Sequence, residues 1–334
     1  MSFQTVERSP GAFQQSITFE QVQAMCQAAF GREARAASAV ELGLGSYNST
    51  YRVDIGADRP VILRVAPAPA RQSRTERQLM RNEHASVPYL APIMPLMPRT
   101  LAIDFTHSVI GRDYLFQTML PGVPAPDGLA AYPRPQWAWF YRQMGSISAS
   151  IQAVRGSRFG RVAGPTFATW SEAIIAYLDD IAADLDTAGL DAADVREVMA
   201  AANRDSGILD EITEPRLLHG DLWDANVMIM PGEPEPTICG VLDYDRASWG
   251  DPAFDWAIFL AGMRPGTERD SFWETYGPPA STPSALGRTL FYRACHIGAA
   301  RVERHRLGRQ TVPATYDQMR QVLQDLRHKD RPHT

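Results

Sequence analysis

The spacing of apolar positions changes along the chain, from a strand-like pattern to a helical one. Short stretches rich in β-branched and aromatic residues, bounded by turn-forming residues, predict strands over 37–42, 50–55 and 60–65. The links 43–48 and 56–59 are short, so these three strands form an antiparallel meander. A helix precedes the meander over about 18–30, where Thr18 and Gln21 form a capping box and Gly31 is a stop. A charged helical segment over 74–86 and strands over 100–105 and 114–119 follow.

Beyond the Pro-rich stretch 121–126, the apolar spacing is helical. The predicted helices cover residues 137–154, 169–187, 192–209, 253–262, 286–306 and 316–327. Short strands over 216–218, 226–230 and 237–242 form one small β patch among them. The sequence therefore predicts an α+β protein with a β-rich domain over 1–120 and a mainly helical domain over 121–334.

Composition narrows the class of protein. With 334 residues and 45% hydrophobic content the chain can bury a sizeable core, and its net charge of −5 argues against a nucleic-acid partner. The three cysteines are far apart and make no metal-binding pair, and the first residues lack the apolar core of a signal peptide. The longest apolar run, 87–97, contains three prolines and is too short to cross a bilayer. We expect a cytoplasmic protein without membrane association.

Candidate chemistry lies at the ends of the short strands in the helical part. The segment 219–226 reads HGDLWDAN, and a predicted hairpin then leads to VLDYD over 241–245. A loop can present Asp221 and Asn226 to one point, and Asp243 arrives from the paired strand. Carboxylate and amide oxygens are ligands that suit Mg²⁺. A single Asp is common in any turn, but this combination indicates a magnesium site.

These motifs resemble the catalytic and metal-binding segments of the aminoglycoside phosphotransferase and choline-kinase-like family. The second segment continues into Gly250, Asp251, Pro252 and Asp255, similar to the family's IDxxxxxxGDPxxD pattern. The resemblance implies a bilobal protein-kinase-like fold. It implies that Asp221 is the catalytic base or orients the attacking hydroxyl, and that Asn226 and Asp243 hold Mg²⁺. His219 and Asp251 would be scaffold residues, with His219 a hydrogen-bonded structural histidine. Asp251 and Asp255, near a helix start, would cap that helix and brace the catalytic loop.

The same resemblance gives the nucleotide half of the site. The loop 43–49 is similar to the family's phosphate-covering loop, because glycine lets backbone N–H groups approach phosphates. Residues 113–122 resemble the family's hinge, where backbone groups meet a purine. The nucleotide-binding residues implied in these two segments are Gly43, Gly45, Ser46, Asn48, Gln117 and Met119.

The third strand departs from the family pattern, since Arg64 stands where a phosphate-binding Lys is usual. Arginine keeps the charge and can bind phosphate bidentately. Lys329 is the chain's one lysine, so Arg64 is interpreted as a replacement; an ordinary solvent-facing strand arginine is the alternative. Glu83 is the expected partner of Arg64. Glu76 is the competing choice, and it is otherwise expected to be a solvated charge.

The implied activity is an ATP- or GTP-dependent O-phosphotransferase acting on a hydroxyl of a sugar, an amino-alcohol or an antibiotic-like compound. A cationic acceptor would suit Asp224 and the acidic helix 169–187, although an ordinary solvated helix face explains those acids as well. The arginines of helix 286–306 weaken the case for a polycationic acceptor. The protein is expected to be a monomer or a homodimer.

Two other functions stay open at this point. A nucleotide-binding pseudokinase or regulatory module is supported by Arg64 alone and opposed by the intact Asp221, Asn226 and Asp243. A protein kinase is disfavoured, because HGD and DYD stand where HRD and DFG are typical and no APE-like segment follows.

Overall fold

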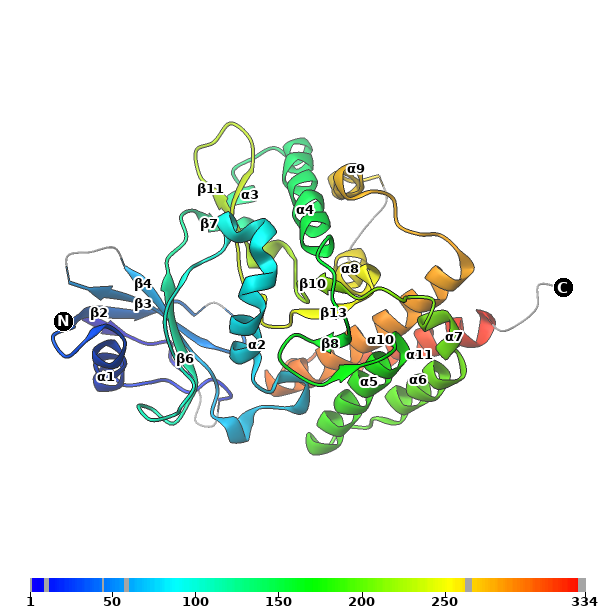
Figure 1. The fold of residues 1–334 in the computed structure, drawn as a ribbon, viewed down its shortest axis with the longest axis horizontal. Coiled ribbons are helices and arrows are strands. Elements are labelled where there is room, and N and C mark those ends of the chain that lie inside the picture. The colour runs from blue at the N-terminus through cyan, green and yellow to red at the C-terminus, as the bar shows by residue number, and fades with distance from the viewer. Residues whose placement is uncertain (1, 9–11, 44, 57–59, 262–265, 330–334) are drawn as a thin grey trace. The chain divides into compact units, whose positions relative to one another are not determined.

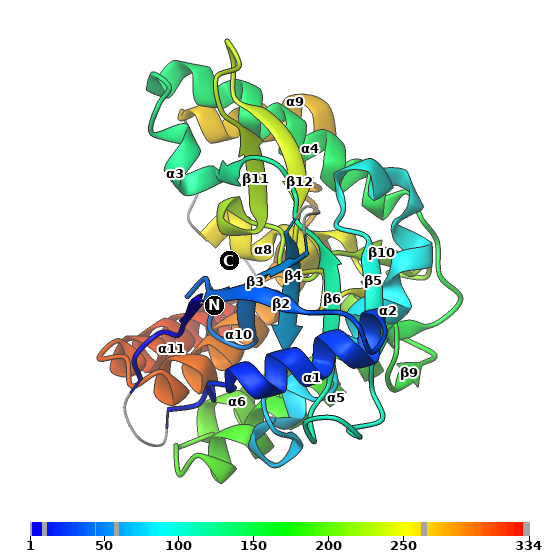
Figure 2. The ribbon, with the colours of Figure 1, turned by 90° about the vertical axis from the view of Figure 1, so that its left-hand side faces the viewer.

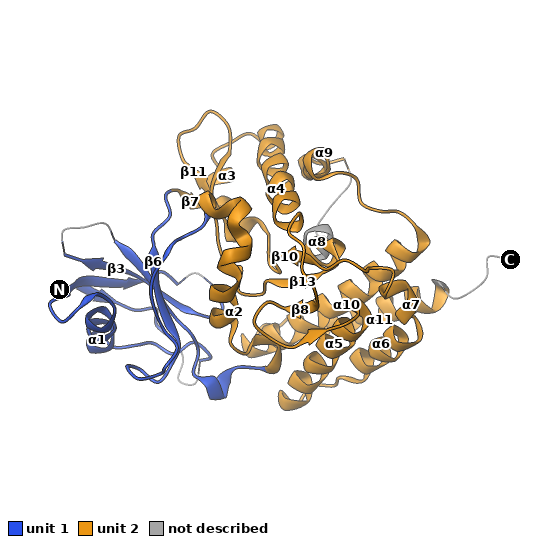
Figure 3. Ribbon diagram, viewed as in Figure 1, with its two compact units in different colours: residues 1–73, 97–121 blue, residues 74–96, 122–334 orange. Residues whose placement is uncertain are grey.

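The computed structural model describes residues 2–8, 12–43, 45–56, 60–261 and 266–329, which form two compact units (Figures 1 and 3). The first unit consists of residues 1–73 and Met97–Pro121, and the second of Arg74–Leu96 and residues 122–334. The segment Arg74–Leu96 therefore belongs to the mainly helical unit, although it precedes the boundary expected after residue 120.

The first unit is built on one six-stranded sheet. Its elements are β1 (Ser2–Gln4), α1 (Phe19–Phe30), β2 (Ala36–Glu41), β3 (Ser49–Ile55), β4 (Val61–Val65), η1 (Pro69–Arg71), β5 (Thr100–Asp104) and β6 (Tyr114–Thr118). The strand order is β1-β2-β3-β4-β6-β5. The antiparallel meander β2-β3-β4 is confirmed, as are β5 and β6. Strand β1, which pairs with β2 in parallel, was not expected. Leu44 and residues 57–59 of the predicted links lie outside the described residues.

Helix α1 packs on one face of this sheet (Figure 2). Its capping box is present, with Thr18 and Gln21 bonded as the sequence predicts, and Gly31 ends it with a positive φ of 99°. Val22, Met25 and Cys26 are fully buried in the core of this unit, which the sheet residues Tyr51, Val53, Leu63 and Phe116 complete. Burying an apolar side chain of this size contributes about 1.5–3 kcal/mol to the free energy of folding. The apolar side of the helix is therefore held against this face of the sheet.

The second unit is mainly helical. Its helices are η2 (Arg74–Glu76), α2 (Leu79–Ser86), η3 (Val87–Leu96), α3 (Ala125–Leu129), η4 (Arg134–Gln136), α4 (Trp137–Gln152), α5 (Trp170–Thr187), α6 (Ala193–Arg204), α7 (Ser206–Leu209), η5 (Asp224–Asn226), α8 (Pro252–Ala261), η6 (Glu268–Asp270), α9 (Ser271–Tyr276), α10 (Pro283–Arg306) and α11 (Val312–Lys329). Its strands are β7 (Val123–Pro124), β8 (Phe159–Arg161), β9 (Thr166–Phe167), β10 (Arg216–Leu218), β11 (Val227–Met230), β12 (Thr237–Val241) and β13 (Ser248–Gly250). The six predicted helices are confirmed with shifted ends, except that 192–209 is interrupted at Asp205; Gly262 lies outside the described residues.

The single β patch predicted in this unit was wrong. Strands β11 and β12 form a hairpin that β7 joins, whereas β10 pairs with β13 in a second sheet that continues to β8 and β9. Three-residue strands specify no partner by their own pattern. The chain leaves β10 through a loop and enters β11 in the other sheet. That loop carries Asp221.

The core of this unit lies where α5, α6, α10 and α11 pack together. Buried apolar residues such as Leu178, Val195, Cys295 and Met319 fill it. Arg301 of α10 is fully buried in the same region, with N–O distances of 2.9 and 2.6 Å to Asp194 and its guanidinium 3.7 Å from the Tyr316 ring centroid. Across the described residues, no helix is both apolar enough and long enough to cross a membrane.

The buried ion pair makes a testable contribution to stability. Replacing Asp194 by Ala leaves the guanidinium of Arg301 buried without its carboxylate, so we expect a loss of about 3 kcal/mol in the free energy of unfolding. Asp317→Ala removes the exposed partner of Arg320 and is the matched control, with an expected change below about 0.5 kcal/mol. Urea unfolding of the two variants measures both values; equal losses would contradict the buried-pair argument.

Candidate active site

The loop between β10 and β11 holds the HGDLWDAN motif in a defined conformation. The carboxylate of Asp255, in the first turn of α8, accepts hydrogen bonds from the backbone N–H groups of His219 (3.0 Å) and Gly220 (2.7 Å). Gly220 has a φ of 85°, and a Cβ there would lie 2.3 Å from the carbonyl oxygen of Arg246. A side chain does not fit at this position. The prediction that Asp255 braces the loop is confirmed.

His219 has a structural role. Its ring is fully buried, and its Nδ1 accepts a hydrogen bond from the Asp221 backbone N–H at 3.3 Å. Burial lowers the pKa of the imidazole, so the neutral form that can accept this bond is favoured. His219 therefore orients the backbone of Asp221, as predicted.

Asp221 and Asn226 lie side by side, as the spacing predicts. The Asn226 side-chain nitrogen donates to the backbone oxygen of Asp221 (2.8 Å) and to its Oδ2 (3.0 Å). The amide oxygen of Asn226 is thereby the atom of that side chain that can bind a cation. The backbone of the same residue accepts a bond from Leu242 N–H at 2.8 Å, which joins the loop to the end of β12.

The surroundings of Asp221 disfavour the ionised form of its side chain. Burial raises its pKa to about 7; the Arg246 guanidinium acts in the opposite direction, and the nearby Asp243 carboxylate raises it further. Asp243 directly follows Leu242, whose N–H is bonded to the Asn226 carbonyl oxygen, so the two motifs found in the sequence meet at one site.

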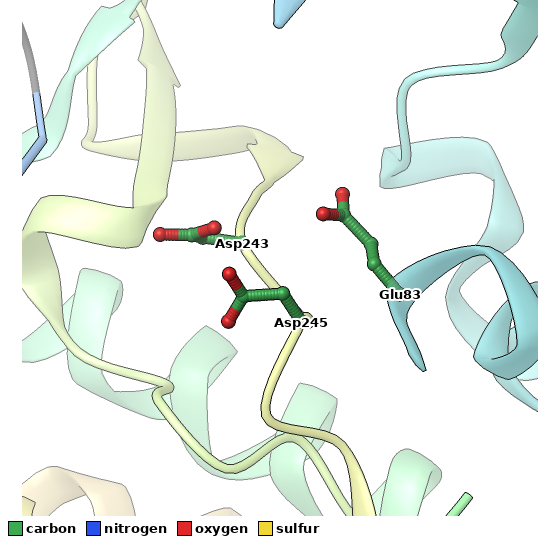
Figure 4. A group of neighbouring side chains, drawn as sticks. All are labelled: Glu83, Asp243 and Asp245. Carbon is green, nitrogen blue, oxygen red and sulfur yellow. The ribbon is translucent and has the colours of Figure 1, made fainter. Parts of the chain in front are cut away.

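Two carboxylates that follow strand β12 lie beside a third from helix α2. The side chains of Glu83, Asp243 and Asp245 each offer an oxygen, and these atoms lie within 4.8 Å of one another (Figure 4). Glu83 and Asp245 are almost completely buried. Oxygen donors of this kind fit Mg²⁺, which takes one or two carboxylates together with water and phosphate oxygens. Asp243 has a φ of 61°, a left-handed conformation that costs free energy in a residue other than glycine.

Asp245 was not predicted as a site residue. The available signal was an acid two positions after Asp243, but the left-handed φ of Asp243 means that this segment is not an extended strand in which such spacing fixes a shared face. The intervening Tyr244 is buried and does not join the group. Figure 4 shows the Asp243, Asp245 and Glu83 side chains converging from two segments, the one after β12 and helix α2.

In the first unit, the glycine-rich loop connects β2 to β3. Gly43 and Gly45 have φ values of 64° and 86°, and the side chain of Gln14 donates to the Asn48 carbonyl at 2.8 Å. Asn48 is buried, whereas a Cβ on Gly45 would meet nothing within 4 Å. The space beside Gly45 is compatible with a backbone that approaches a phosphate, and the binding role of this loop stays a prediction.

The other residues of this unit that are predicted to contact the nucleotide lie on β4 and on or just after β6. Arg64 is 8% exposed, which argues against the alternative of a solvent-facing strand arginine. Gln117 lies opposite Ile62 of β4 and Thr100 of β5, so strand β6 has a neighbour on each side. Met119 follows the end of β6 and is 46% exposed. The backbone N–H and C=O groups that are not used in pairing β6 with β4 and β5 therefore begin after Thr118.

Two acids that the sequence analysis placed in solvent or in a substrate cleft are structural. Glu76 is 4% exposed and pairs with Arg246 (3.2 Å) and with Arg306, so the expectation of a solvated charge was wrong. Asp184 of α5 accepts bonds from the backbone N–H groups of Arg74 (2.7 Å) and Thr75 (2.9 Å). It stabilises the first turn of η2.

Asp224 is engaged inside the protein. Its Oδ2 accepts a bond from the hydroxyl of Tyr141 at 3.1 Å and lies 3.4 Å from Arg269. The neighbouring Trp223 is 47% exposed, whereas most of the other aromatic residues near the motifs are buried. The charge of Asp224 is thus already matched by an arginine.

A sequence profile of the phosphotransferase enzyme family matches residues 38–288. The chain belongs to this family. Comparison with curated protein sequences gives no match.

Solved structures share the fold at low sequence identity. The GDP complex of aminoglycoside 2'-phosphotransferase-IIIa is 15% identical with a TM-score of 0.62, and covers 92% of this chain and 98% of its own. A thermostable mutant of aminoglycoside phosphotransferase APH(4)-Ia, in a ternary complex with AMP-PNP and hygromycin B, is 18% identical with a TM-score of 0.60, at 92% and 97% coverage. A candidate fructosamine-3-kinase from Thermobifida fusca YX-ER1 is 19% identical with a TM-score of 0.60, at 92% and 98% coverage. The protein-kinase-like fold that the motifs implied is confirmed.

In this phosphotransferase-family protein, the raised pKa of Asp221 makes a prediction about stability. The folded state disfavours the carboxylate, so stability present below the unfolded pKa of about 4 is lost as pH rises through about 7. Without metal, the free energy of unfolding of Asp221→Asn should therefore exceed that of wild type by about 4 kcal/mol at pH 8 and equal it at pH 4.

Thermal unfolding in EDTA across this pH range measures the difference. Asp317→Asn, at an exposed position on α11, is the matched control and should show no such pH dependence. A constant offset between Asp221→Asn and wild type would contradict the raised pKa.

Proposed function

We propose that the protein transfers the γ-phosphoryl group of ATP or GTP to a hydroxyl of a small molecule in a magnesium-dependent reaction. The observation that supports this best is the joint placement of Asp221 and Asn226 on one loop with Asp243 on the strand end bonded to it. Family membership supports the reaction class. The bound GDP and AMP-PNP of two structural relatives support a nucleotide donor.

In this proposal the carboxylate of Asp221 accepts a hydrogen bond from the acceptor hydroxyl and aims its oxygen at the γ-phosphorus. The new O–P bond forms as the bond to the β–γ bridging oxygen breaks, and the hydroxyl proton passes to Asp221 and then to solvent. The Asp221 pKa of about 7 is suitable for such a group near neutral pH. Asn226 holds the carboxylate in place through its side-chain nitrogen.

The same proposal assigns Asn226 and Asp243 as the magnesium ligands. Their oxygen donors fit the ion, and the ion supplies charge neutralisation for the nucleotide phosphates when bound. Asp245 and Glu83 add negative charge beside Asp243. The glycine-rich loop, Arg64, Gln117 and Met119 stay predicted nucleotide contacts, and the pairing of Arg64 with Glu83 stays a prediction.

For the acceptor, we propose a hydroxyl on a sugar, amino-alcohol or antibiotic-like compound, without a requirement for several positive charges. One structural relative is described in complex with hygromycin B, and another is described as a candidate fructosamine-3-kinase. The same fold therefore serves different acceptors. Near the catalytic loop, Arg246 and Arg269 accompany the acids. Such a mixed environment does not select a polycation by charge.

The function is tested with a panel of hydroxyl-bearing amines, sugars and aminoglycosides, each with ATP and with GTP. A mass gain of one phosphoryl group on an acceptor is the expected result. Asp221→Ala should lower turnover by about 10²–10⁴-fold, because the hydroxyl loses its base, while nucleotide affinity changes little. Nucleotide binding without phosphorylation of any acceptor would favour the regulatory alternative, and near wild-type turnover of Asp221→Ala would reject its assignment.

The metal assignment is tested separately. Asp243→Asn replaces a charged ligand by a neutral amide, so the Mg²⁺ concentration for half-maximal turnover should rise by about tenfold or more. Asn226→Ala should raise it less. Asn203→Ala, on the exposed face of α6, is the control. Unchanged half-saturation in both site variants would reject these ligands.

A further inference from the structure

The side chain of Asn82, on helix α2, makes three hydrogen bonds, and the proposed mechanism gives this residue no role. Its side-chain nitrogen donates to the carbonyl oxygens of Asp245 (2.8 Å) and Ala247 (2.9 Å). Its side-chain oxygen accepts from the backbone N–H of Ala163 at 2.8 Å. The residue is 1% exposed, so these bonds form away from water. A buried amide with both donors and its acceptor engaged fixes the backbone that it touches.

The backbone that Asn82 touches immediately follows the strained residue of the site. Asp243 has its left-handed φ of 61°, and residues 245–247 must return the chain toward β13. On the other side, the Arg246 carbonyl packs against Gly220 of the catalytic loop. A conformation of this cost persists only where its surroundings determine it. Asn82 supplies two fixed points directly after it.

A second anchor holds the same segment. The side chain of Arg246 pairs with Glu76, and η2, which carries Glu76, is held by the carboxylate of Asp184. The segment from η2 to α2 thus contacts residues 245–247 through one ion pair and one amide. Of these two contacts, the ion pair holds a side chain, and Asn82 holds the backbone.

We propose that Asn82 is a positioning residue that keeps residues 243–247 in the conformation in which Asp243 and Asp245 present their carboxylates to a divalent cation. The statement about the cation rests on the proposed function; the statement about the backbone does not. The role requires an amide, because a carboxylate of the same shape offers no donor to two carbonyl oxygens and an alanine offers neither donor nor acceptor.

The backbone part is tested by hydrogen exchange in the metal-free protein, without nucleotide or acceptor. In Asn82→Asp, exchange of peptides covering 243–248 should become at least about tenfold faster, since the backbone loses both donors, while peptides from α6 stay unchanged. Asn203→Asp is the matched control, because its amide donates to Met199 on the exposed α6. If Asn82→Asp does not fold, Asn82→Ser, which keeps one hydroxyl donor, should show a smaller change in the same peptides.

The cation part is tested by titrating the protein with Mn²⁺. Electron paramagnetic resonance measures the concentration of free ion at each step. The dissociation constant should rise about tenfold in Asn82→Asp or Asn82→Ser, and stay unchanged in Asn203→Asp. With an acceptor in hand, the same variants should need more Mg²⁺ while the KM for the acceptor is unaltered, a split that general destabilisation does not produce.

Exchange of 243–248 that matches wild type in the folded Asn82 variants would overturn the inference, even if the wild-type protein binds Mn²⁺ and turns over. Faster exchange with unaltered Mn²⁺ affinity would overturn its cation part. A wild-type protein that binds no Mn²⁺ would instead reject the proposed metal site and leave the exchange result to decide the role of Asn82.

Discussion

Carboxylates held close together, two of them buried and two half-buried, are the constraint on which this site depends. Asp221, Asp243, Asp245 and Glu83 come from two loops and a helix, and their mutual repulsion adds to the cost of burial. The pKa of Asp221 reports that cost. A group of this kind is stable only if the rest of the unit holds its backbone in place and supplies compensating positive charge or hydrogen-bond donors.

The surrounding residues do this in three ways. Asp255 accepts two backbone N–H groups of the catalytic loop, and Asn226 donates to Asp221. Arg246 brings positive charge near Asp221 and is itself paired with Glu76. The four-helix core around Leu178 and Val195 contributes apolar burial that offsets the strained and charged loops. The packed helices therefore stabilise the fold, whereas the charged and strained residues of the site destabilise it.

The division into compact units shows where the site is built. Helix α2 and η2 belong with the helical unit, where Asn82 and Glu76 contact the segment that carries Asp243. Glu83 lies on the same short helix. A carboxylate that the resemblance assigned to an arginine of the sheet thus also belongs to the acidic group after β12. Helix α2 thus supplies one carboxylate of that acidic group and the amide that holds the backbone beside it.

The sequence by itself determined the elements and the principal motifs. The meander, the capped α1 and most helices follow from periodicity and turn residues, and the short spacing from Asp221 to Asn226 predicts their contact, since a five-residue loop leaves few arrangements. Only the tertiary structure decided which short strands pair, that Asp245 joins Asp243, and that Glu76, Asp184 and Asn82 are buried structural partners. For Asp184, Asn82 and Glu76 the partners lie about 110 to 230 positions away in the chain, and local patterns carry no information about such partners.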